Sequence, residues 1–107
     1  MTDADFVTVA RIGDLAPGEM TYVDVRNTAV CLINLGGEYH AINDTCTHAD
    51  ASLSDGTIDG DIIECPLHGG CFDIRSGAPA AMPVVTPIEV YQVRIVGDTV
   101  QVALIEP

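Results

Sequence analysis

Two short cysteine and histidine motifs constrain this chain more than any other feature of its sequence. Cys46-Thr47-His48 is followed, after sixteen intervening residues, by Cys65-Pro66-Leu67-His68. Both motifs fall in residues 43–87, a segment rich in Asp, Gly and Pro that predicts an irregular, loop-rich insert. Thiolate sulfur and imidazole nitrogen are metal ligands, so the pattern predicts a four-ligand site formed by Cys46, His48, Cys65 and His68.

That set of ligands suits two different metal centres. One is a tetrahedral zinc ion, and the other is a [2Fe–2S] cluster in which two histidines replace two cysteines on one iron. A zinc finger pairs cysteine with cysteine and histidine with histidine at short spacing, whereas each motif here is mixed. Mixed loops can place both sulfurs on one iron and both nitrogens on the other. The pattern therefore favours the cluster over a structural zinc module used only for interaction.

The rest of the chain predicts an all-β domain. No stretch of ten or more residues has apolar positions at helical spacing. Alternating apolar and polar residues predict hairpins at 30–42 and 89–104, each with a glycine-containing turn, and earlier strands at 6–9 and 20–25. A length of 107 residues suits one domain and leaves no room for a second, catalytic one.

The charge of the chain excludes several kinds of partner. Four arginines, no lysine and sixteen acidic residues give a net charge of −12. This charge disfavours nucleic acid and anionic membrane surfaces as partners, since both are bound through Lys and Arg. No apolar run reaches the roughly eighteen residues of a bilayer span. Residues 1–5 are acidic where a signal peptide would be basic, which favours a cytoplasmic protein.

At this point the residues resemble a known family. The motif C-x-H-x16-C-x2-H, followed by Gly69-Gly70-Cys71-Phe72-Asp73, resembles that of Rieske-type ferredoxins of bacterial aromatic-ring-hydroxylating dioxygenase systems. The resemblance implies a Rieske fold over residues 1–107: an antiparallel β-sandwich base domain with a small cluster-binding subdomain at about 43–84. It also implies that Cys46 and Cys65 bind the buried iron, while His48 and His68 bind the outer iron near solvent.

The resemblance further implies an electron-transfer component and not an enzyme. Such a carrier passes one electron from a flavin-dependent ferredoxin reductase to a terminal oxygenase in aromatic hydrocarbon catabolism. The sequence supports this implication. Once His48 and His68 are assigned to the cluster, only His40 remains for a mononuclear iron site, and no G-x-G-x-x-G nucleotide motif follows a strand. The alternative is a Rieske-like small subunit of a nitrite reductase or of another oxidoreductase. A net charge of −12 predicts that the partner presents a basic docking face.

The chain departs from the high-potential Rieske proteins of membrane complexes. Those proteins carry an extra cysteine in each loop, and the corresponding positions here are Ala51 and Leu67, so that disulfide cannot form. They also place a serine and a tyrosine after the second loop, where this chain has Gly70 and Phe72. Hydrogen bonds to sulfur raise the reduction potential of a cluster. Because Gly70 and Phe72 provide no side-chain hydroxyl for such bonds, the sequence predicts a low reduction potential.

The remaining chemically active residues have simpler interpretations. Cys31 lies within a predicted strand and is expected to be a small buried apolar residue. The four-ligand motif is complete without Cys71, and His40 is expected to be a strand residue at or near the surface. Acidic residues surround the ligand loops and form either a docking rim or solvated turns: Asp44, Asp50, Asp55, Asp59, Asp61 and Glu64.

Overall fold

The computed structural model describes residues 5–47, 50–67 and 69–105, and nearly all of the regular structure in them is β. The strands in chain order are β1 (Phe6–Arg11), β2 (Met20–Val25), β3 (Thr28–Leu35), β4 (Glu38–Asn43), β5 (Thr57–Asp59), β6 (Ile62–Glu64), β7 (Cys71–Asp73), β8 (Pro79–Ala81), β9 (Val90–Val96) and β10 (Thr99–Ala103). A short 3-10 helix, η2 (Leu53–Asp55), precedes β5. In the part of the chain that is described, no helix has the length and apolar character that crossing a membrane requires.

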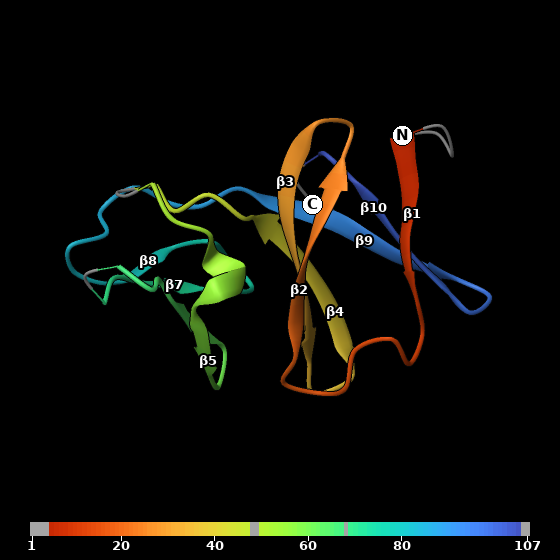
Figure 1. The fold of residues 1–107 in the computed structure, drawn as a ribbon, viewed down its shortest axis with the longest axis horizontal. Coiled ribbons are helices and arrows are strands. Elements are labelled where there is room, and N and C mark those ends of the chain that lie inside the picture. Colours follow the sequence, from red (N-terminus) through yellow and green to blue (C-terminus); the bar gives the residue numbers. More distant parts are fainter. Residues whose placement is uncertain (1–4, 48–49, 68, 106–107) are drawn as a thin grey trace.

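Six strands form the base of the molecule in the order β1-β10-β9-β4-β3-β2, with every pairing antiparallel (Figure 1). Strands β4 and β9 join two three-stranded halves through the pairs Ala41–Tyr91 and Ile42–Val90. One apolar cluster draws on both halves, with members such as Leu32 from β3 and Val100 and Val102 from β10. The halves therefore cover a common core, and the expected β-sandwich base is confirmed.

The two predicted hairpins are present with tight turns. Leu35 pairs with Glu38 across Gly36 and Gly37, whose φ angles are +64° and +101°. Positive φ at both central residues is the turn geometry that matches the twist of the flanking strands, and glycine adopts it without steric cost. The β9–β10 hairpin turns in the same two-residue manner between Val96 and Thr99.

A second antiparallel sheet, in the order β5-β6-β7-β8, lies at one end of the base (Figure 1, left). Its strands are three residues long, and the chain enters it from β4 and returns to β9. All four strands lie within residues 43–87, which the sequence predicted only as an irregular, loop-rich insert. Strands of three residues show too little alternation to be recognised by period alone.

Strand β3 connects the two sheets because it is buried on both faces. Val30 and Leu32 face the core of the base, whereas Cys31 and Ile33 belong to a second apolar cluster. That second cluster includes Leu53, Ile63, Phe72 and Ile74, all of them fully buried and all outside the base strands. The continuous apolar run of β3 therefore reflects packing on two sides, and the second sheet rests on the outer face of this strand.

Gly77 fixes the route of the chain from β7 back to β9. Its φ is +78°, its N–H donates to the carbonyl of Asp73 (2.8 Å), and its carbonyl accepts from Ile88 (2.9 Å). A Cβ atom at this position would overlap the carbonyl oxygen of Ile88. The close backbone approach leaves no room for any side chain at this position.

Replacing Gly77 with Ala should therefore destabilise the fold. We expect the free energy of unfolding to fall by roughly 2–4 kcal/mol, of which about 1 reflects the positive φ and about 1–3 the overlap. Gly97→Ala is the matched control, since its φ is +59° but no atom lies within 4 Å of the added Cβ. The control should lose only about 1 kcal/mol in urea denaturation. Equal losses in the two variants would contradict the packing argument.

Candidate metal centre

The first cysteine loop leaves the base sheet where β4 ends at Asn43. A single antiparallel bridge pairs Thr45 with Ser52, and the N–H of Cys46 donates to the carbonyl of Ala51 (3.0 Å). These bonds give the excursion a hairpin-like start and return. They place Cys46 on the inner side of the loop, and this residue is only 4% exposed.

Asp44 braces this loop and does not belong to a docking rim. The residue is 1% exposed, and its Oδ1 accepts from the N–H of Ser54 (2.8 Å). Its backbone N–H donates to Ala29 (2.9 Å), and its carbonyl accepts from Leu53 (2.7 Å). The rim interpretation was therefore wrong for Asp44, because its carboxylate is buried and is satisfied by a backbone N–H inside the loop. The other five acidic residues of that set are exposed.

The second cysteine loop connects β6 to β7. Its base is closed by a hydrogen bond from the N–H of Cys65 to the carbonyl of Gly70 (2.7 Å). Cys65 is 1% exposed, although the neighbouring Leu67 is 45% exposed. The backbone N–H of Leu67 turns inward and donates a hydrogen bond to the Cys65 thiol. The loop therefore presents its sulfur to the interior while its apex faces solvent.

The structure brings the thiols of Cys46 and Cys65 within hydrogen-bonding contact of each other. Burial raises the pKa of Cys65, and the adjacent thiol adds to the increase, while the N–H of Leu67 opposes it. Both residues lie in the apolar cluster beneath the two loops. Two buried sulfurs from separate loops are a suitable ligand pair for one iron of a [2Fe–2S] cluster, so the described residues fit that group.

The other two predicted ligands, His48 and His68, lie outside the described residues. Among the residues that are described, no three His, Cys, Asp or Glu side chains gather closely enough to bind a metal ion. Among the described residues, no third metal-ligating side chain joins the two thiols, and no competing metal site is present. The complete ligand set remains a prediction.

The remaining cysteines are accounted for by packing. Cys31 is fully buried, as expected, and its Sγ lies 3.7 Å from the sulfur of Met20. Burial raises the pKa of this thiol, with Asp44 as a second cause. Cys71 is half-buried at the start of β7, with its Sγ 3.5 Å from the carbonyl oxygen of Gly69. Burial also raises the pKa of the Cys71 thiol, and Glu64 adds to the effect.

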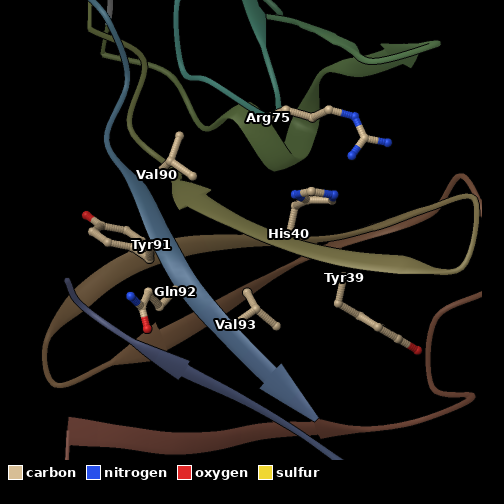
Figure 2. Close-up of a pocket in the computed structure, with 7 residues that line it drawn as sticks. All are labelled: Tyr39, His40, Arg75, Val90, Tyr91, Gln92 and Val93. Atoms are coloured by element: carbon tan, nitrogen blue, oxygen red, sulfur yellow. The ribbon is translucent and has the colours of Figure 1, made fainter. Parts of the chain in front are cut away.

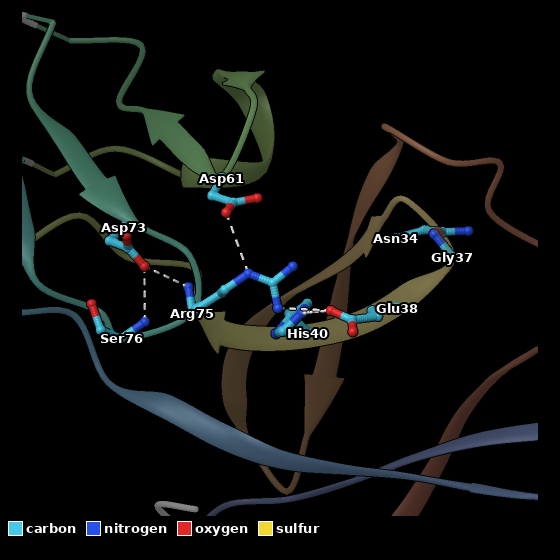
Figure 3. A network of polar contacts seen from close by, with 8 residues as sticks. All are labelled: Asn34, Gly37, Glu38, His40, Asp61, Asp73, Arg75 and Ser76. Carbon is cyan, nitrogen blue, oxygen red and sulfur yellow. Dashed lines mark hydrogen bonds and ion pairs between the residues drawn. The ribbon is translucent and has the colours of Figure 1, made fainter.

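A polar network joins the base to the second sheet (Figure 3). The Arg75 guanidinium contacts Glu38 of the β3–β4 hairpin through Nη1 (2.7 Å) and Asp61 of the β5–β6 turn through Nε (3.3 Å). His40 lies 3.3 Å from the same Glu38 carboxylate and is half-buried, as its strand position predicts. The Arg75 side chain lowers the pKa of Glu38. Nothing in the sequence pattern had indicated this role for Arg75.

A hollow of about 350 Å³ lies beside this network, at the junction of the two sheets (Figure 2). Its lining includes Tyr39, His40, Arg75 and Val93, and it contains no cysteine. The hollow is therefore separate from the two-thiol site. The chemistry of the candidate metal centre resides in the loops and not in this cavity.

Residues 5–92 match the Rieske [2Fe-2S] domain family. The chain belongs to this family. Its fold class and its [2Fe–2S] cofactor are confirmed at the level of the family, and the structural zinc interpretation is set aside.

Among Rieske proteins, the similar relatives include ferredoxins of dioxygenase systems. The chain is 42% identical over 92 residues to the ferredoxin component of biphenyl 2,3-dioxygenase from Rhodococcus jostii (strain RHA1), covering 86% of each. It is 40% identical over 99 residues to ferredoxin CarAc of Metapseudomonas resinovorans, covering 92% of each. A chain in the solved complex of reduced oxygenase and oxidized ferredoxin of carbazole 1,9a-dioxygenase matches with a TM-score of 0.90 and 38% identity over 95% of both chains.

The Rieske fold is also shared with proteins of the alternative class. A Mycobacterium tuberculosis protein described as an NADH-dependent nitrite reductase small subunit matches with a TM-score of 0.81, over 92% of this chain and 93% of that one. Its identity to this chain is 24%, so the likeness shows the fold alone. The higher identities to dioxygenase ferredoxins favour the main interpretation over the nitrite reductase alternative.

Cluster assembly should depend on the four predicted ligands and on no other cysteine. Cys46→Ala, His48→Ala, Cys65→Ala or His68→Ala should each abolish the visible absorbance and the bound iron and sulfide, because each removes one ligand. Cys71→Ser is the matched control and should retain both. Loss of the cluster in Cys71→Ser would show that the ligand set is wrong.

Proposed function

We propose that this protein is a one-electron carrier of a multicomponent dioxygenase, taking electrons from a flavin-dependent ferredoxin reductase and delivering them to a terminal ring-hydroxylating oxygenase. The observation that carries the proposal is the meeting of two buried thiols, from separate loops at one end of a β scaffold, in a Rieske chain similar to such ferredoxins. A cytoplasmic location accompanies this function. We also propose residues 43–84 as the cluster-binding subdomain.

The proposed ligand assignment divides the donors by residue type. Cys46 and Cys65 would bind the inner iron, and His48 and His68 would bind the other iron. When bound, the cluster takes up and releases one electron at a time. The chain itself supplies burial for the sulfurs, the Leu67 N–H that donates to Cys65, and the two loops that fix the distance between the ligands.

The proposed docking site for the oxygenase is the loop end of the molecule. Large apolar side chains are exposed there although the chain carries a net charge of −12: Leu67, Met82 at 77% and Val85 at 71% exposure. Thr47 of the first loop donates to the carbonyl of Thr86 (2.8 Å), which ties the segment with Met82 and Val85 to the loop of Cys46. An apolar contact beside the cluster excludes water, while the acidic residues around it attract a basic partner surface.

Measurements of electron transfer into and out of the protein test this function. NADH and a flavin-dependent reductase should reduce the purified protein, and mixing the reduced protein with a terminal oxygenase in a stopped-flow instrument should reoxidise it. The rate should fall as ionic strength rises, because opposite charges attract less strongly at high salt. A protein that accepts electrons but never passes them to any dioxygenase component would refute the proposal.

Val85→Glu should slow transfer to the oxygenase by about tenfold, because a carboxylate in an apolar contact costs on the order of 1–3 kcal/mol. Ile95→Glu is the matched control, because it also replaces an exposed apolar residue with a carboxylate. Ile95 is 47% exposed and lies near the β9–β10 turn, at the opposite end of the molecule from the loops (Figure 1). The control should transfer electrons at the normal rate. Similar slowing in both variants would indicate general charge repulsion instead of local docking.

The midpoint potential should lie near the low end of the Rieske range, about −150 mV. Gly70 has no side chain and Phe72 has no hydroxyl, so neither provides a side-chain hydrogen bond to sulfur. A net charge of −12 also opposes the added electron. Voltammetry, combined with an EPR spectrum of the reduced protein, measures this. A value well above zero would contradict the proposal and favour a respiratory role.

A further inference from the structure

We propose that Tyr91 is a positioning residue for the cluster: through Asn43 it orients the loop that carries Cys46, and this orientation contributes to the reduction potential. The inference rests on the ligand assignment proposed above. Tyr91 lies on β9, far along the chain from both cysteine motifs. Its influence would be transmitted through a short series of hydrogen bonds.

Asn43 is the residue at which strand becomes loop. Its backbone N–H donates to the carbonyl of Glu89 (2.9 Å), which ends the pairing of β4 with the β9 segment. Its side-chain Oδ1 accepts from the N–H of Thr45 (2.8 Å). A side-chain amide that binds the backbone two residues onward forms an Asx turn, which sets the direction in which the chain continues. That chain reaches Cys46 at the next residue.

Tyr91 determines which way the Asn43 amide points. Asn43 Nδ2 donates to the Tyr91 hydroxyl (3.0 Å), and that hydroxyl donates in turn to Oε2 of Glu89 (3.1 Å). With Nδ2 bound to the hydroxyl, Oδ1 faces the N–H of Thr45, which is the arrangement that the donors and acceptors require. Removing the hydroxyl would free the amide to rotate and would weaken the turn.

The Tyr91 ring is a rigid support for this bond. The residue is 5% exposed and packs in the core of the base, among residues of both halves of the sheet. Figure 2 shows its hydroxyl pointing away from Arg75 and His40, which are drawn on the other side of β9 in this view. Burial raises the pKa of the Tyr91 phenol, so the hydroxyl remains a donor to Glu89 at neutral pH.

A second tie to the same segment lies just beyond Cys46. The Thr47 hydroxyl donates to the carbonyl of Thr86 (2.8 Å). Cys46 is thus flanked by bonds to residues 86–91 on both sides, through Thr45 and Asn43 before it and through Thr47 after it. Its own N–H is bound to Ala51 (3.0 Å). Reduction potentials respond to the hydrogen bonds around the ligating sulfurs, so a small shift of this loop should be measurable.

The experiment compares Tyr91→Phe with wild type as cluster-loaded proteins. We expect the midpoint potential and the g values of the reduced cluster to change in the variant. We also expect deuterium exchange of the peptide that contains Thr45 to become about three to ten times faster, as loss of one hydrogen bond predicts. Asn43→Ser, whose shorter side chain cannot reach Tyr91, should shift both measurements in the same direction and provides a second route if Tyr91→Phe folds poorly.

Two kinds of control separate positioning from other effects. Tyr22→Phe and Tyr39→Phe remove hydroxyls elsewhere: Tyr22 is 51% exposed, and the Tyr39 hydroxyl lies 3.4 Å from the N–H of Gly13. Glu89→Gln removes a charge but keeps an acceptor for Tyr91, so loop exchange should stay unchanged. If Tyr91→Phe retains its cluster but matches the tyrosine controls in potential or in loop exchange, the positioning role is refuted and the ligand assignment stands. A wild-type protein without a cluster would overturn both.

Discussion

Strand β3 is the element on which both sheets depend, because its two faces belong to two different cores. Leu32 points into the base, and Ile33 points into the cluster beneath the cysteine loops. A strand with apolar side chains on both faces must be covered on both sides. The second sheet has strands of three residues, which are too short to be stable alone, so its position is determined by packing on β3.

The cysteine loops have little regular structure and are instead held by individual buried contacts. Asp44 braces the first loop from within, and the carbonyl of Gly70 closes the second. The two loops converge so that Cys46 and Cys65 meet in an apolar environment. Metal ions bind the thiolate form of cysteine, so binding of a metal would release protons from these thiols. The contacts of the two loops therefore hold the two sulfurs next to each other.

Much of the fold and part of the site were predictable from the sequence, for physical reasons that are local. Period-two alternation and a glycine in each turn identified the β3–β4 and β9–β10 hairpins. The β2–β3 turn gave no such signal, because Arg26 and Asn27 adopt positive φ there without any glycine. The mixed cysteine and histidine spacing predicted two ligand loops, and the structure brings the two sulfurs together. Asp44 was misjudged because an acidic residue in a loop is usually solvated, and only its surroundings show otherwise.

The sequence by itself determined the longer strands, the glycine-containing turns of two hairpins and the chemistry of the candidate ligands, since each depends on residue type and spacing over a few positions. The tertiary structure decided which distant residues support them. Tyr91 reaches Asn43, and Arg75 bridges Glu38 and Asp61, although nothing in the local sequence of either residue marks it for that contact. A hydrogen bond between residues 48 positions apart depends on how the sheets pack, and packing is a property of the whole chain.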